Sequence, residues 1–241
     1  MGVALVAVLA GGVLGALLPV PVHRLCVPYG DPPRATCDHC GQRLVWAGTS
    51  CRRCGHRLGP QWWATAAVAG IGAGVLALSL PDGPAALVVP ASIVLALLGT
   101  GLGAIDLSCR RLPSNIVLPS IVVGAVALTV VSAGTGDWAA LGRAALGALV
   151  LSAIHLGLYL IPGGNLGFGD VQLAVLLGLL LGYLGWPEVV WGALLPWLLN
   201  APVVLVLLLA GRVGRRSRVP FGPSMLAGAV LAVALMAALS G

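Results

Sequence analysis

Two aspartates beside long apolar runs are the residues best suited to chemistry. Asp106 closes the run 84–106, and Asp170 opens the run 170–186 directly after the glycine-rich stretch 163–169. Charged side chains at membrane depth are rare and usually serve a function. Two carboxylates that lie close together share a proton, so one can act as a base while the other acts as an acid. The pattern therefore predicts a pair that hydrolyses a peptide bond by activating water.

Each aspartate also has a purely structural explanation. Asp170 could cap the helix that it opens, because the free N–H groups and the dipole of a helix N-terminus favour a carboxylate. Asp106 could pair with Arg110 one turn later, or simply end a helix. His155 lies within an apolar run, where packing or a helix–helix hydrogen bond explains it, and the chain has no His-Glu-x-x-His metallopeptidase motif.

Four of the six cysteines form two Cys-x-x-Cys pairs, which are separated by ten residues. They are Cys37, Cys40, Cys51 and Cys54. Two such pairs can close on one tetrahedral zinc ion, and a site with four thiolates and no open position is structural. Gly41 and Gly55 directly follow the pairs and permit tight turns. We therefore predict a zinc-binding loop, with two disulfides or free thiols as the alternative.

The other cysteines and the neighbouring histidines are expected to play no part in that site. Four cysteines already complete the metal shell, so His39 and His56 are interpreted as bystanders. Cys26 and Cys109 have no partner in the pattern, and core packing is the simpler role for each.

The composition indicates a multi-span membrane protein. The chain has 241 residues, of which 59% are hydrophobic and only 8% charged, and its mean hydropathy is +1.04. An ordinary soluble domain carries about 25% charged residues. The net charge of +6 comes from arginines between the apolar runs, which indicates membrane topology rather than binding of nucleic acid.

A membrane-spanning helix needs about 20 apolar residues, and eight runs approach that length. They are 3–20, 62–80, 84–106, 115–133, 138–161, 170–186, 188–210 and 222–240. The first lacks the basic start of a signal peptide and is interpreted as a retained span. We expect an all-α polytopic membrane protein of about eight helices, with residues 1–61 forming the first helix and the cysteine loop and residues 62–241 forming the bundle.

The arginines predict the orientation of this bundle. All but Arg143 lie in the loops 21–61, 107–114 and 211–221, which alternation of the spans places on one side. Because arginine-rich loops remain in the cytoplasm, the N-terminus is expected outside the cell membrane. Asp106 and Asp170 then lie at the same cytoplasmic face.

Several motifs together resemble the type IV prepilin peptidases, which are intramembrane aspartyl proteases with a Gly-x-Gly-Asp motif. The motifs are Ile105-Asp106-Leu107, Leu112-Pro113 with Asn115, Gly167-Phe168-Gly169-Asp170-Val171 and Pro220-Phe221-Gly222-Pro223, in addition to the four-cysteine loop. The resemblance implies that Asp106 and Asp170 are catalytic, and that Gly167 and Gly169 form a hinge that lets Asp170 approach Asp106. It implies cleavage of the leader of type IV prepilin or pseudopilin precursors, after a glycine and before the hydrophobic helix of the substrate.

Bifunctional members of that family also methylate the new N-terminus with S-adenosylmethionine. The chain departs from their pattern at several polar positions: Gln172 stands where lysine is common, and no acid lies between Cys54 and the run 62–80. Methylation is therefore left open. A transporter that relays protons through its acids is the alternative, and a structural subunit of a secretion machine is a third. The transporter alternative explains neither the cysteine loop nor two acids at one membrane edge.

Overall fold

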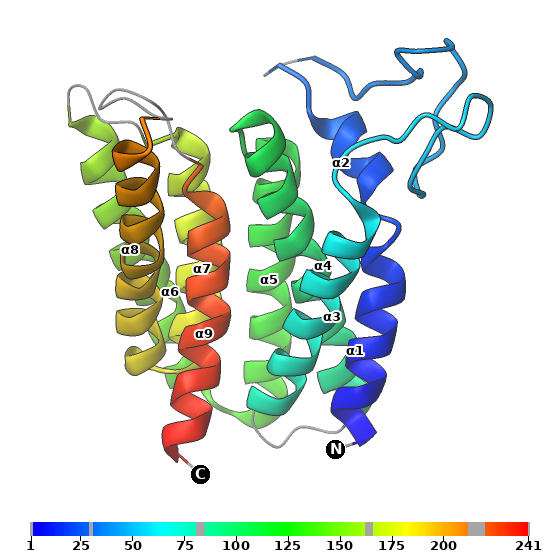
Figure 1. The fold of residues 1–241 in the computed structure, drawn as a ribbon. Coiled ribbons are helices and arrows are strands. Elements are labelled where there is room, and N and C mark those ends of the chain that lie inside the picture. The colour runs from blue at the N-terminus through cyan, green and yellow to red at the C-terminus, as the bar shows by residue number, and fades with distance from the viewer. Residues whose placement is uncertain (1, 29–30, 81–84, 162–165, 212–219, 241) are drawn as a thin grey trace. The chain divides into compact units, whose positions relative to one another are not determined.

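The computed structural model describes residues 2–28, 31–80, 85–161, 166–211 and 220–240 (Figure 1). Side chains at positions 85–88 are not among those described. The described residues form α-helices joined by short loops, without a named strand. The helices are α1 (Gly2–Gly15), α2 (Pro19–Leu25), α3 (Trp62–Ser79), α4 (Ala85–Cys109), α5 (Ser114–Thr135), α6 (Trp138–Leu160), α7 (Phe168–Leu184), α8 (Trp186–Leu209) and α9 (Gly222–Ser240).

All eight predicted apolar runs are helical, which confirms the all-α class. Within the described ranges, six helices are long and apolar enough to cross a membrane, and seven if α1 and α2 count as one span. The axes of α1 and α2 differ by 51° across a short break. Pro19 and Pro21 lie directly after this break, at the start of α2. Helix α7 has 17 residues and is the shortest of the predicted spans. The chain is therefore a multi-pass membrane protein.

The chain divides into two compact units, residues 1–111 and 112–240, and each is described by itself. In the first unit α1, α3 and α4 pack side by side (Figure 1). Its contacts use small residues: Ala7, Ala73 and Ala96 form a buried cluster. Small side chains let membrane helices approach closely, which is how such helices gain packing energy without a hydrophobic driving force.

The second unit contains α5 to α9, in which α6 and α7 make the closest pair. Gly178 of α7 lies against the backbone of Gly147 in α6, and Gly182 lies against the backbone of Arg143 and Ala144. Residue numbers thus rise along α7 as they fall along α6, so the two helices are antiparallel. Glycine is required here because the two backbones touch.

Gly178→Ala is expected to destabilise the second unit. A Cβ at this position would lie 2.7 Å from Ala148 Cα and closer still to the Gly147 carbonyl oxygen, so the helices would have to separate. Overpacking of this kind costs about 1–3 kcal/mol. The thermal unfolding midpoint of the protein in detergent should fall for Gly178→Ala and stay within error for Gly157→Ala, whose Cβ meets nothing within 4 Å. Equal midpoints for the two variants would contradict the close packing.

Parts of three predicted loops lie outside the described residues. These are residues 29–30 of the loop 21–61, residues 162–165 of the loop 162–169 and residues 212–219 of the loop 211–221. The last of these segments contains four of the arginines used for the topology. A proline disfavours a helical conformation at the residue before it. Accordingly, α4 ends at Cys109, and Pro113 is the N-cap of α5.

Candidate active site and four-cysteine centre

The cysteine loop contains two turns of the same design. In each, the glycine after the second cysteine donates its N–H to the carbonyl oxygen of the first cysteine, at 2.9 Å from Gly41 to Cys37 and from Gly55 to Cys51. Both glycines have positive φ, 69° and 68°, a conformation that side chains disfavour. Isolated antiparallel bridges, Thr36 to Arg43 and Ser50 to Arg57, close the two turns. The predicted role of the glycines is confirmed.

The two turns bring the four thiols together. Their Sγ atoms all lie within 4.8 Å of one another, with Cys40 and Cys51 3.5 Å apart and Cys37 and Cys54 3.9 Å apart. Four sulfurs at 2.3 Å from a tetrahedral zinc are about 3.8 Å from each other. The donor set and its spacing therefore fit zinc. His39 and His56 stack on each other with ring centroids 5.4 Å apart and do not belong to the cluster.

Hydrogen bonds to sulfur prepare Cys51 for this role. The backbone N–H groups of Cys54 and Arg53 donate to its sulfur and lower the pKa of the Cys51 thiol to about 6. Metal ligands must be thiolates, so the turn favours the form that a cation binds. A bound zinc ion would complete a site with no open position and supply folding energy to the loop.

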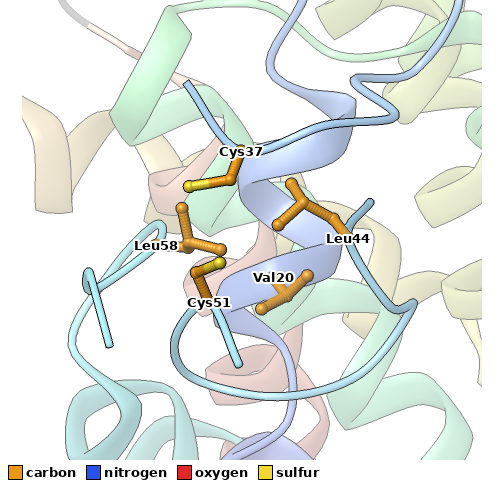
Figure 2. Packing of buried hydrophobic residues seen from close by; sticks show 5 residues of the cluster. All are labelled: Val20, Cys37, Leu44, Cys51 and Leu58. Carbon is orange, nitrogen blue, oxygen red and sulfur yellow. The ribbon is translucent and has the colours of Figure 1, made fainter. Parts of the chain in front are cut away.

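The loop is fastened to α2. Val20 of this helix joins Cys37, Leu44, Cys51 and Leu58 in one buried cluster (Figure 2). The Val20 N–H also donates to the Gly48 carbonyl oxygen at 3.0 Å. Because of the break after α1, the end of the first predicted span forms the separate helix α2, which packs against the cysteine loop. The loop extends beyond α2 (Figure 1).

Arg24 holds the other side of that loop and was not singled out by the sequence. It is 8% exposed, donates to the Leu44 carbonyl oxygen and lies with its guanidinium carbon 3.8 Å from the centre of the Trp46 ring. A stacked, buried arginine fixes a loop through packing as well as charge. From the sequence, Arg24 was used only as one of the loop arginines that predict the orientation of the helices. The sequence did not show that it lies beside Trp46.

The expectation that Cys26 and Cys109 are unpaired was wrong. The structure joins them in a disulfide with a Cα–Cα distance of 5.8 Å, within the range that this bond requires. Cys26 caps the C-terminus of α2 and Cys109 is the last residue of α4, and these two helices are in contact. Their sequence separation of 83 hid this proximity from the sequence.

Asp106 lies in the last turn of α4, not at its end as the run of apolar residues indicated. Its side chain is 5% exposed, although it carries an ionisable carboxyl group. Arg110 ends the helix with a φ of 54°, and its N–H donates to the Asp106 carbonyl oxygen at 2.7 Å. The aspartate therefore belongs to the first compact unit, on a helix with a defined end.

Asp170 lies in the first turn of α7, in the second compact unit, and is 8% exposed. Its Oδ2 accepts a hydrogen bond from the Gly167 N–H at 2.9 Å, and its own N–H donates to the Gly167 carbonyl oxygen at 3.0 Å. The N-cap of α7 is Gly167, and Asp170 is the third residue of the helix, so the structural explanation was right about a capping hydrogen bond but not about the position of the N-cap. One of its carboxyl oxygens is used in this way, which orients the group without neutralising it.

The family to which the chain belongs is shown by its sequence. The model of the type IV leader peptidase family matches residues 93–239, more than half of the chain, and this match contains both Asp106 and Asp170. The chain belongs to the type IV leader peptidase family. It is therefore a membrane-embedded peptidase. No curated protein and no solved structure matches it.

In this leader peptidase Gly169, one of the two glycines beside Asp170, has an observed packing role. Neither is among the positive-φ glycines of the described chain. Gly169 leaves room for Leu112: a Cβ there would lie 2.8 Å from Leu112 Cβ and 3.3 Å from the Leu112 carbonyl oxygen. Leu112 belongs to one of the motifs of the family resemblance and is 8% exposed, but the sequence did not indicate its contact with Gly169. The hinge role of Gly167 and Gly169 remains a prediction.

Gly169→Ala is expected to displace the start of α7, because Leu112 cannot retreat without moving the backbone before Pro113. The thermal unfolding midpoint should fall by an amount that corresponds to about 1–3 kcal/mol, and peptidase activity should fall with it. Gly142→Ala, which meets nothing within 4 Å in α6, is the matched control. An unchanged midpoint for Gly169→Ala would show that the contact with Leu112 is not tight.

Proposed function

We propose that this leader peptidase is an aspartic endopeptidase that removes the leader of a type IV prepilin or pseudopilin precursor at the cytoplasmic face of the cell membrane. Asp106 and Asp170 are its acid/base pair. The observation that carries the proposal is the family match, which covers both aspartates together with the Gly-Phe-Gly-Asp sequence.

The burial of the two aspartates supports their role. Asp106 and Asp170 are the two acidic side chains that are buried among the described residues. A carboxylate inside a membrane helix bundle is expensive unless it has a function. In the proposed reaction one carboxylate takes a proton from the attacking water, while the protonated one polarises the peptide carbonyl and then gives its proton to the leaving nitrogen.

The topology supports the cytoplasmic location of the reaction. The described arginines of the cysteine loop and of the segment after α4, including Arg110 and Arg111, lie on the side that the positive-inside rule assigns to the cytoplasm. The four cysteines would hold a structural zinc ion there. The transporter alternative gains no support from the family, so it is not developed further.

Methylation of the new N-terminus is not part of the proposal. The cysteine loop agrees with the bifunctional members, but Gln172 departs from them. Gln172 lies in α7 two residues after Asp170, and its side-chain oxygen is buried. An assay with S-adenosylmethionine therefore decides between a peptidase and a peptidase that also methylates.

The proposal is tested by reconstituting the full chain in liposomes with a prepilin precursor. Mass spectrometry should find a mature product cut after the last glycine of the leader, before the hydrophobic helix. The mass of its first residue, with and without S-adenosylmethionine, reports methylation separately. A precursor that stays intact, in liposomes where a known prepilin peptidase cleaves it, would rule the proposed function out.

A further inference from the structure

His155 is a buried polar residue that the proposed mechanism does not use. It lies in the last two turns of α6 and is 2% exposed. In the described part of the second unit, the buried polar side chains are Ser132, His155 and Asp170. Ser132 has a partner, since its hydroxyl lies 3.3 Å from Tyr183 Oη. A histidine inside a membrane bundle requires an explanation of the same kind as a buried acid.

The hydrogen bonding of His155 fixes which nitrogen is free. Its Nδ1 lies 2.8 Å from the Leu151 carbonyl oxygen. A carbonyl oxygen only accepts, so Nδ1 carries the hydrogen and donates it. In the neutral ring Nε2 is then a hydrogen-bond acceptor. This Nε2 is fully buried and has no partner in the described structure.

The register of α6 and α7 places this acceptor level with Asp170. Gly147 lies against Gly178, and one turn earlier in α6 Ala144 lies against Gly182. At the other end of α6, the Tyr159 ring contacts the Phe168 ring with centroids 5.7 Å apart. His155 is one turn before Tyr159, so it lies beside the first turn of α7, which carries Asp170.

The recorded ring contact of the imidazole is with an aromatic side chain. Its ring centre is 6.2 Å from that of Phe221, which precedes α9 and is itself 4.7 Å from the Trp197 ring of α8. A neutral imidazole nitrogen of this kind accepts one hydrogen bond, which one N–H group of a bound peptide can donate.

We propose that His155 Nε2 accepts a hydrogen bond from a backbone N–H of the substrate, at the start of the hydrophobic helix that follows the cleavage site. The inference rests on the proposed function. The first four N–H groups of a helix have no partner within it. At membrane depth an unsatisfied N–H costs several kcal/mol. His155 is therefore a substrate-positioning residue beside Asp170, while Asp170 carries out the chemistry.

Two substitutions separate the free nitrogen from the anchored one. The amide of His155→Asn reaches the position of Nδ1 and keeps the hydrogen bond to Leu151, but it has no acceptor at the position of Nε2. The longer His155→Gln can place its amide oxygen there. We expect kcat/KM for the prepilin to fall about 5- to 100-fold in His155→Asn, the cost of one unpaired buried group, and to be largely restored in His155→Gln. The change should appear mainly in KM, with thermal unfolding midpoints of the two variants measured alongside.

A substrate-side experiment tests the same bond without altering the enzyme. Prepilin peptides are synthesised in which an ester replaces the amide at the second, third or fourth residue after the cleavage site, which removes one N–H at a time and leaves the scissile amide intact. For the wild-type chain one of these esters should be a poorer substrate than the others by about 5- to 100-fold. The His155→Asn variant should cleave that ester and the corresponding amide peptide with the same kcat/KM.

The possible outcomes distinguish a failure of the inference about His155 from a failure of the proposed peptidase function. If His155→Asn and His155→Gln cleave equally well, or if His155→Asn is as sensitive to the ester as the wild type, the inference is overturned while the peptidase stands. If the wild-type chain cleaves no prepilin at all, the proposed function falls and the inference with it. Loss of sensitivity to a single ester in His155→Asn supports both.

Discussion

Asp170→Asn is expected to lower leader cleavage by at least about 100-fold while the protein inserts and folds normally. Asparagine keeps a side-chain oxygen where Oδ2 accepts the Gly167 N–H, so the start of α7 is preserved. It cannot take up a proton from water or return one to the leaving nitrogen. The substitution therefore removes the proposed chemistry and leaves the observed hydrogen bond. Initial rates of prepilin cleavage in liposomes measure the effect.

Asp106→Asn should give the same loss, and Asp137→Asn is the matched control. Asp137 is the N-cap of α6, and its Oδ1 accepts the Ala140 N–H at 2.9 Å, so the same change preserves the same kind of hydrogen bond away from the proposed pair. Its variant should cleave at the wild-type rate. Substantial cleavage by both Asp106→Asn and Asp170→Asn would show that the two acids are structural.

Removing one cysteine of the cluster is expected to release the metal and unfold the loop. Purified wild-type protein should contain about one zinc ion per chain, and Cys51→Ser should contain almost none. Burying Val20, Leu44 and Leu58 contributes about 1.5–3 kcal/mol for each side chain, whereas a structural zinc site contributes about 10–16 kcal/mol. A bound zinc ion would therefore stabilise this loop more than its hydrophobic packing does.

Trypsin reports the fold of the loop directly, because Arg52, Arg53 and Arg57 are exposed on it. Brief digestion should cut Cys51→Ser at these arginines and leave the wild type intact. Cys26→Ser is the control, since Cys26 lies outside the cluster and its loss should leave the zinc content unchanged. A wild-type protein without bound metal, or a Cys51→Ser protein that retains it, would contradict the assignment.

Helices and local turns were predictable because they depend on neighbouring residues. The eight apolar runs predicted where the helices lie, and six or seven of the described helices are long and apolar enough to cross a membrane. The positive φ of Gly41 and Gly55 followed from the need for a tight turn after each cysteine pair. The spacing of the four cysteines predicted a cluster that the structure forms. These features need no information about which helix packs against which.

Features that depend on packing between distant segments were not predictable in the same way. The disulfide between Cys26 and Cys109, the stacking of Arg24 on Trp46 and the contact of Gly169 with Leu112 each join residues that the sequence does not relate. His155 looked like a packing residue because its level relative to Asp170 follows only from the register of α6 and α7. For Asp106 and Asp170, the sequence predicts a common membrane face, and their partnership remains a proposal.

The buried alanine cluster of the first unit has a consequence for how the protein can be divided. The family match begins at residue 93, within α4, but the Ala96 side chain of that helix packs against Ala7 of α1 and Ala73 of α3. A truncated chain reduced to the matched region would leave this surface of α4 facing lipid, and the helix that bears Asp106 would lose its neighbours and its disulfide anchor. We therefore expect the minimal peptidase to be larger than the matched region, so that a shortened enzyme made for study should still begin at α1.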